Sequence, residues 1–573
     1  VLRAGSSPHI KSHFVGSVVY IAAEDSSGPM SRWLLIDGQQ RLTTLTLLLA
    51  AIKAALIKNP IEEAEEDDAD LTPSAIDDYY LKNTHGRGDR RHKLRLRRMD
   101  HDTLEALLDG REFPEKPSQR ILANYGFFLE WLEAADIRQV YKGILKLVAV
   151  DVALRRGEDD PQMIFESLNS TGKDLSQADL IRNYVLMSLD EQRQTEVYEA
   201  FWRPIEAAFG ARYSTDFDRF MRDFLTIRLK SSKPINSDEV YVRFREYCLN
   251  DPNRSIEHTL EEIRRFGQYY ALYTFGKEKE PDLNLAFERL RTVADVAGPV
   301  ILQLYESFST LGTLSLSEFV EAVTFLESYV FRRSICEMQT RSLGIIFSSL
   351  AQKIQPDSPL RSLKVALSRL SDSQRFPTED EFIGSLIARP LYSLRHCFYL
   401  LDRLENHSKE ITPTSHLTIE HVMPQNENLC PEWRQMLGSD WKEVHRTWLH
   451  RLGNITLTAY NSRYSDRPFE VKKTVDHGFN DSPLRLNRFI KEQEVWTPKE
   501  MDIRGRNLAL KAAAIWPNLT VRKAWVKEAE LQDHRASAAR FPIEKIPMEE
   551  RCQQLFEKIR PLILDLGPDV QEL

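Results

Sequence analysis

Cysteine is scarce in this chain of 573 residues, and no two cysteines form a Cys-x-x-Cys pair. The five cysteines lie far apart, at Cys248, Cys336, Cys397, Cys430 and Cys552. This spacing argues against a zinc site built on cysteine. An odd, scattered set is typical of proteins in a reducing compartment, so we predict a cytoplasmic protein.

Long apolar runs are also lacking. The longest candidate, Leu42 to Leu56, is interrupted by threonines and by Lys53, so the sequence predicts no membrane span. The chain starts at Val1 without an initiator methionine or a signal peptide, and we expect part of the N-terminus to be missing.

A positive overall charge is lacking too, because the formal net charge is −8. This balance argues against nonspecific coating of nucleic acid but permits a local basic cleft. The segment "RGDRRHKLRLRRM" (87–99) holds seven Lys or Arg residues, and its "KLRLRR" core alternates apolar and basic residues as an exposed strand does. Two interpretations stay open for this segment: a solvated strand face or a phosphate-facing surface.

The apolar patterns predict an α+β fold that is predominantly helical. Two short strands with a polar turn are expected between 17 and 36, and "ILKLVAVDVAL" (144–154) is a third strand candidate. Amphipathic helices dominate from about 191 to 406. The long helices at 260–400 form either a core or a homodimer interface, and the apolar stripe favours the core. We predict four parts, with these residue ranges: 1–190, 191–406, 407–517 and a helical tail at 518–573.

A polar turn joins a strand to a helix at "LIDGQQRLTTL" (35–45). Helix N-termini expose unpaired N–H groups that suit phosphate, and glycine permits close backbone approach. Arg41 can bind phosphate through two parallel hydrogen bonds, while Gln39 and Gln40 can donate to oxygens. Asp37, before Gly38, can hold a metal ion or orient the arginine. The alternative is a structural turn with an Asp–Arg pair, and the spacing does not decide between the two.

A second constellation lies in "IEHVMPQN", "LGNITL" and "YNSRYSDRPFEVKK". A carboxylate and a histidine side by side can have separate catalytic roles: Glu420 can hold a divalent metal while His421 removes a proton from water. Asn454 can brace the loop that carries the histidine, and Asn461 can supply a second oxygen to the metal. Between Lys442 and Lys473 the local net charge is +4, which suits a polyanion.

These motifs resemble a known family. "FVGSVVY", "LIDGQQRLTTLTLLL" and "IFESLNSTGKDLSQADLIRNYVL" resemble the N-terminal half of GmrSD-type modification-dependent (type IV) restriction enzymes. "TIEHVMPQN", "HRLGNITLTAYNSRYS", "FEVKK" and "DIRGRNLALKAAAIWP" resemble their C-terminal HNH nuclease half. The resemblance covers most of residues 14 to 517. It extends to phosphorothioate-sensing, SspE-like relatives that share the architecture.

The resemblance implies a ParB/sulfiredoxin-like N-terminal domain and a ββα-metal (HNH) nuclease domain. In the first, Asp37 to Arg41 would bind GTP or ATP, and a second signature containing Glu166 and Asn169 would lie near it. In the second, His421 would activate water, Asn454 would brace the loop, and Glu420 and Asn461 would hold Mg²⁺ or Mn²⁺.

The implied function is phage defence. The enzyme would cut double-stranded DNA carrying glucosylated or hydroxymethylated cytosine, and nucleotide binding or hydrolysis would control the nuclease. Two alternatives stay open: a phosphorothioate-sensing, DNA-nicking NTPase, and a nucleotide-responsive DNA-binding regulator with a weak nuclease. A segment that family members carry before "FVGSVV" is not found here, so the sensing pocket stays undefined.

Overall fold

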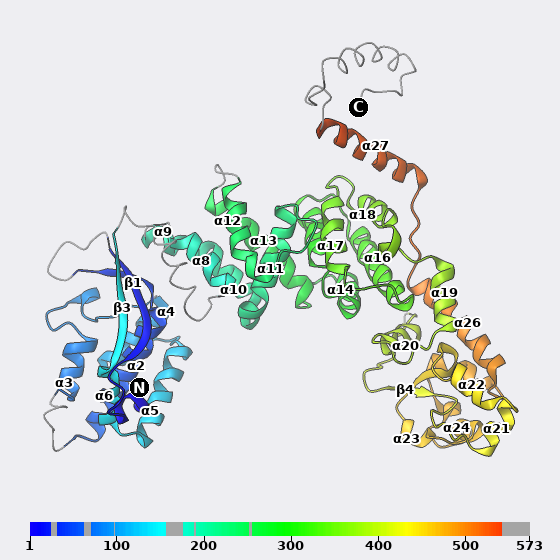
Figure 1. Ribbon diagram of the computed structural model, residues 1–573, viewed down its shortest axis with the longest axis horizontal. Helices are drawn as coiled ribbons and strands as arrows, with labels where there is room; N and C mark the ends of the chain where they lie inside the picture. The colour runs from blue at the N-terminus through cyan, green and yellow to red at the C-terminus, as the bar shows by residue number, and fades with distance from the viewer. Residues whose placement is uncertain are drawn as a thin grey trace, which may run out of the picture. The chain divides into compact units, whose positions relative to one another are not determined.

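A computed structural model describes residues 1–23, 31–61, 70–96, 98–155, 176–187, 189, 191–250, 255–408 and 410–540. The chain divides into two compact units, Val1–Gln194 and Thr195–Leu573 (Figure 1). Most described residues are helical and few are in strands, as the α+β, predominantly helical prediction requires. The four-part division stays a prediction.

The first unit contains a three-stranded sheet in the order β2-β1-β3. Strands β1 (His13–Ala22) and β2 (Trp33–Asp37) pair antiparallel, which confirms the two strands expected there. Strand β3 (Leu147–Leu154) runs parallel to β1. The third expected strand therefore starts three residues late, because Ile144 and Leu145 end a helix.

Helix α2 (Gln39–Lys58) forms the centre of this unit's core and packs against α5 (Gln119–Ala134). By length and composition α2 is the one described helix apolar enough to cross a membrane, although no such span was expected. Its residues from Thr46 to Ile52 are buried within the protein, so core packing accounts for its apolar character. The remaining helices of the unit are α1 (Leu2–Ser6), α3 (Pro73–Ile76), α4 (Arg98–Asp109), α6 (Ile137–Leu145) and α8 (Gln177–Met187).

The described residues of the basic segment, 87–96 and 98–99, form no strand, so the strand prediction is wrong there. Its described part contains a short 3-10 turn (Gly88–Arg90) and a single β-bridge between Lys82 and His92. The His92 ring is buried, 3.2 Å from the Asp109 carboxylate, which Arg91 also contacts. Local ion pairing therefore decides the backbone path here, and the alternation of apolar and basic residues does not.

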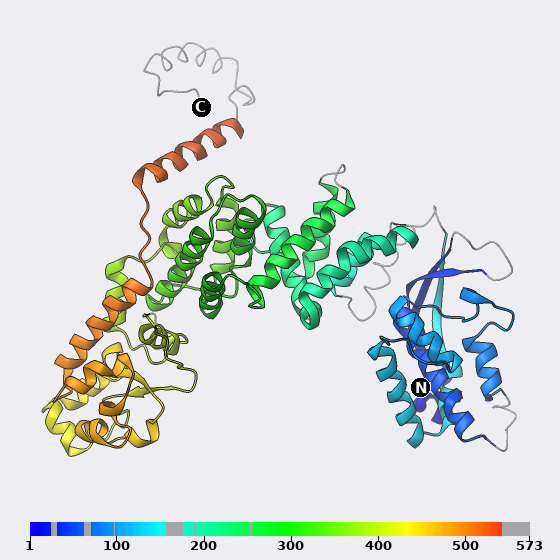
Figure 2. The same cartoon turned by 180° about the vertical axis from the view of Figure 1, so that it is seen from behind.

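The second unit begins with an array of helices, which confirms the amphipathic prediction for the described residues (Figure 2). Their bounds are α9 (Glu191–Val197, across the unit boundary), α10 (Arg203–Phe209), α11 (Tyr213–Arg228), α12 (Val240–Leu249), α13 (Ile256–Thr274), α14 (Pro281–Val293), α15 (Gly298–Tyr305), α16 (Leu316–Ile335), α17 (Leu343–Lys353), α18 (Pro359–Ser368), α19 (Glu379–Ala388) and α20 (Cys397–Glu405).

The same unit also contains a two-stranded antiparallel sheet flanked by helices, which is called the hairpin below although helices α21 and α22 lie between its strands in the chain. Strands β4 (Thr418–His421) and β5 (Ile455–Thr458) pair antiparallel. A core with two buried tryptophans, Trp433 and Trp496, supports them. The accompanying helices are α21 (Pro431–Leu437), α22 (Trp441–Trp448), α23 (Asn461–Tyr464), α24 (Phe469–Thr474), α25 (Arg488–Glu492) and α26 (Pro498–Ile515). Helix α27 (Lys523–Arg540) follows them in the chain and packs against α18.

Helix α26 is fastened to the start of β5 by Arg504. This side chain is 1% exposed and donates to the carbonyls of Leu452, Gly453 and Ile455 at 2.8–3.1 Å. It also donates to the carbonyl of Leu486. The guanidinium thus supplies hydrogen-bond donors to four backbone carbonyls at the base of the hairpin that water does not reach.

We expect Arg504→Met to lower the free energy of unfolding by about 2–4 kcal/mol, because it leaves those buried carbonyls without donors. Chemical denaturation of the full chain measures this. Arg506→Met is the matched control, since Arg506 is exposed and pairs only with Asp502 in the structure described. Equal stability of the two variants would contradict this role.

Candidate functional site

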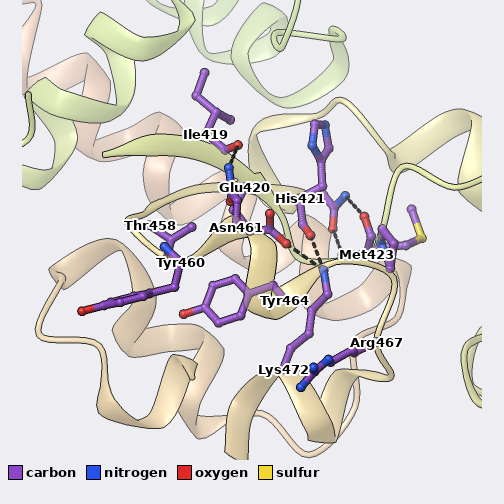
Figure 3. A network of polar contacts seen from close by, with 12 residues as sticks. Ile419, Glu420, His421, Met423, Thr458, Tyr460, Asn461, Tyr464, Arg467 and Lys472 are labelled. Atoms are coloured by element: carbon purple, nitrogen blue, oxygen red, sulfur yellow. Dashed lines mark hydrogen bonds and ion pairs between the residues drawn. The ribbon is translucent and has the colours of Figure 1, made fainter. Parts of the chain in front are cut away.

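The C-terminal site is built on the hairpin β4–β5. Glu420 and His421 end strand β4, opposite Thr456 and Ile455 of β5. Because neighbouring residues of a strand face opposite sides, the two side chains diverge. Figure 3 shows the His421 ring pointing to the opposite side of the strand from the Glu420 carboxylate. The site therefore has two halves, one on each side of the strand end.

The first half is a buried ion pair. Lys472, on α24, donates from Nζ to Glu420 Oε1 at 2.7 Å and to the carbonyl of His421 at 2.8 Å. The lysine side chain is fully buried and that of Glu420 is 11% exposed. Burial raises the pKa of Glu420 and lowers the pKa of Lys472, while their contact opposes both shifts. The hydrogen bonds from Lys472 thus fix the position of the Glu420 carboxyl group at the strand end.

Asn461 completes this half from the start of α23. Its Nδ2 donates to Thr418 Oγ1 at 2.7 Å and to the carbonyl of Ile419 at 3.2 Å, so the side chain lies along β4 beside Glu420 (Figure 3). These two acceptors fix the orientation of the amide. Its Oδ1 is buried and has no hydrogen-bond partner. A buried acceptor without a donor is costly, and a bound cation would satisfy it.

The second half is an imidazole pair. His421 is 2% exposed, and its Nε2 lies 3.1 Å from Nδ1 of His450. The other nitrogen, Nδ1, is buried without a partner. Burial, followed by the nearby His450 and Lys472, lowers the pKa of His421 to about 3, so the ring is neutral at pH 7.

Asn454 braces the turn that follows the histidine. It is fully buried, and its Oδ1 accepts from Met423 N at 2.8 Å and from Trp496 Nε1 at 3.1 Å. Its Nδ2 donates to the carbonyls of Met423 and Leu449. The amide therefore makes four bonds within the protein, and it contacts neither Glu420 nor His421 through its side chain in the described structure. It positions the loop and is not itself placed to react.

The N-terminal turn contains an Asp–Arg ion pair, which is expected if the turn has a structural role. Arg41 donates to Asp37 at 2.7 Å and to the carbonyl of Ser17 at 2.5 Å. Gly16 has a φ of +103°, and a Cβ there would collide with the guanidinium. Glycine at this position lets the arginine lie against strand β1. Arg41 thus ties the turn to the sheet.

The same turn keeps the features expected of an anion site. Gly38, with φ +97°, precedes helix α2, and no side chain caps the first turn of that helix. Gln39 and Gln40 are exposed, and Gln39 donates to the carbonyl of Leu35. Unpaired N–H groups at such a helix start suit phosphate. Glu166 and Asn169 of the second signature lie outside the described residues, so their expected position near this turn stays a prediction.

Two family models match the chain. The N-terminal domain of the GmrSD restriction endonuclease matches residues 3–186, and the C-terminal domain of GmrSD restriction endonucleases matches residues 376–511. Together the two matches cover more than half of the chain. The chain belongs to the GmrSD restriction endonuclease family. No curated protein matches it.

Membership in the GmrSD family confirms the resemblance to GmrSD-type enzymes, while the extension to SspE-like relatives stays a prediction. Both domains of a type IV restriction endonuclease are present, so the chain is a DNA endonuclease and DNA is its partner. The matched C-terminal segment contains both halves of the hairpin site, including Glu420 and His421.

Three side chains of this GmrSD site escaped the sequence prediction: Lys472, His450 and Tyr392. Lys472 belongs to the quoted "FEVKK" and His450 opens "HRLGN", but only the folded chain shows their partners. Tyr392 precedes α20, stacks on His450 with ring centroids 5.3 Å apart, and lies edge-on to His421 at 4.5 Å. Nothing in its surrounding sequence marked it.

We expect Asn454→Ala to lower the free energy of unfolding by about 2–4 kcal/mol, because Met423 N and Trp496 Nε1 lose a buried acceptor. DNA cleavage should fall in the same variant, since the turn after His421 loses its brace. Urea denaturation and a plasmid assay measure the two effects. Gln425→Ala, at an exposed position in the same loop, is the control and should change neither.

Proposed function

We propose that this GmrSD-family chain is a phage-defence endonuclease that cleaves DNA carrying glucosylated or hydroxymethylated cytosine. A metal-dependent HNH nuclease within 407–517 would cut. A ParB/sulfiredoxin-like domain within 1–190 would bind GTP or ATP and control cutting through binding or hydrolysis. The observation that carries the nuclease assignment is the hairpin that joins Glu420, His421 and Asn461 at one strand end.

Oxygen donors at the hairpin fit Mg²⁺ or Mn²⁺. Glu420 and Asn461 would hold the ion, and the unpartnered Oδ1 of Asn461 supports this fit. Among the residues that the structure describes, no three His, Cys, Asp or Glu side chains gather for a metal. Two protein ligands nevertheless suffice for Mg²⁺ in sites where substrate phosphate and water complete the shell. When bound, the ion would stabilise charge on the phosphate and on the leaving oxygen.

The reaction assigned to His421 is removal of a proton from water. The neutral ring would accept that proton at Nδ1, the nitrogen that has no partner, while water oxygen forms the bond to phosphorus and the 3′ or 5′ oxygen leaves. Lys472 would hold the Glu420 carboxyl group in place through its hydrogen bond from Nζ. Because His421 is 2% exposed, cutting also requires the side chains that cover it to open.

Nucleotide binding is assigned to the turn Asp37–Arg41. The uncapped start of α2, the left-handed Gly38 and the exposed Gln40 support it. Arg41 already donates to Asp37 and to the carbonyls of Ser17 and Val15, so its guanidinium would order the turn that receives the phosphate.

We expect the parent protein to cut plasmid DNA with glucosylated hydroxymethylcytosine in the presence of Mg²⁺ or Mn²⁺, and EDTA to abolish cutting. His421→Ala should reduce the rate by about 100-fold or more, because general-base catalysis is lost. His416→Ala, an exposed histidine in the same segment, is the control. Gel assays with unmodified, cytosine-modified and phosphorothioate plasmids, each with and without GTP or ATP, measure this.

Cleavage by His421→Ala at the parent rate would contradict the nuclease site. Cutting confined to phosphorothioate DNA would instead support the sulfur-sensing alternative. Nucleotide binding without any cutting would favour the regulator.

We expect Gln40→Ala to weaken GTP or ATP affinity by about fivefold, the loss of one net hydrogen bond. Arg41→Ala should weaken affinity further, and Asn59→Ala, beyond the far end of α2, should not change it. Calorimetric titration of each folded variant measures the affinities. Unchanged affinity in both Gln40→Ala and Arg41→Ala would show that the turn is structural only.

A further inference from the structure

His450 is the close polar neighbour of the His421 ring. It follows α22, and its backbone carbonyl accepts from Leu391 N at 2.7 Å, which fixes the loop that carries Tyr392. Its Nδ1 lies 3.1 Å from His421 Nε2. The Tyr392 ring is nearly parallel to the His450 ring, at 9°, and contacts His421 with its edge. Two ring contacts and one hydrogen bond therefore fix the orientation of both imidazoles.

The shared proton of this pair has two possible positions. If His450 Nδ1 carries it, neutral His421 has its own proton on Nδ1, which is then a buried N–H without an acceptor. If His421 Nε2 carries it, Nδ1 holds only a lone pair, and the proton of His450 moves to its Nε2. His450 is partly exposed, so water can accept from Nε2 there. Buried N–H groups without partners are rarer than buried acceptors without partners, which favours the second arrangement.

We propose that His450 is a positioning residue that holds His421 as the Nε2–H tautomer and leaves Nδ1 free to accept a proton. The hydrogen bond made by one ring nitrogen decides the proton on the other. When Nδ1 takes a proton from water, His421 Nε2–H continues to donate to His450 Nδ1, so the cation keeps its partner. This inference rests on the proposed function, because it assigns His421 as the base.

Two variants separate the hydrogen bond from ring packing. His450→Phe keeps an aromatic ring against Tyr392 but removes the acceptor. His450→Asn removes the ring but offers an amide oxygen near the position of Nδ1. If His450 acts through its acceptor, His450→Phe should reduce kcat by about 10- to 100-fold with little change in KM for DNA. His450→Asn should recover most of that loss.

The tautomer itself is read by ¹⁵N NMR of the imidazoles in the full chain at pH 7, with His421→Asn to assign the signal. We expect a bare Nδ1 and a protonated Nε2 for His421 in the parent and in His450→Asn, and loss of this preference in His450→Phe. Thermal unfolding of each variant checks that it is folded.

A parent spectrum with the proton on Nδ1 of His421 would overturn the proposal, as would parent-like kcat in folded His450→Phe. The spectrum does not depend on cleavage. If His421→Ala cuts normally, the proposed function fails, and the spectrum still decides whether His450 sets the tautomer.

Discussion

The C-terminal site depends on one buried amide. Asn454 joins the turn after His421, the end of α22 and Trp496 of the core through four hydrogen bonds. Arg504 holds the carbonyls on either side of that asparagine. Backbone groups at a hairpin base would otherwise be buried without partners, at a cost comparable to a lost hydrogen bond for each. These hydrogen bonds hold the two short strands in place, so that Glu420 and His421 project from opposite sides of the end of β4.

Part of this site could be predicted from the sequence because several of its residues lie in short motifs that follow one another in a recognisable order. The pair Glu420–His421 and the bracing role of Asn454 followed from their positions in "IEHVMPQN" and "LGNITL". Lys472 and His450 also lie in the quoted motifs, but the sequence does not indicate which side chains they contact, because packing of the folded chain decides such partners. The bulk pattern of strands and helices was likewise predictable from apolar periodicity.

The failures have equally local causes. Alternation in "KLRLRR" predicted a strand, but Lys82, Arg91 and His92 gather around Asp109 and fold the segment into a turn. At the N-terminal turn, the Asp37–Arg41 contact is compatible both with a purely structural turn and with an ordered phosphate-binding turn. The sequence spacing could not separate these two interpretations, because both require the same contact.

The most direct test of the account is Mn²⁺ binding to the full chain, followed by electron paramagnetic resonance without DNA or nucleotide. The account predicts a bound Mn²⁺ in the parent, weakened by about tenfold or more in Glu420→Gln and in Asn461→Ala, and kept in the control Asn428→Ala. Parent-like Mn²⁺ binding in both site variants would contradict the assignment of Glu420 and Asn461 as the metal ligands.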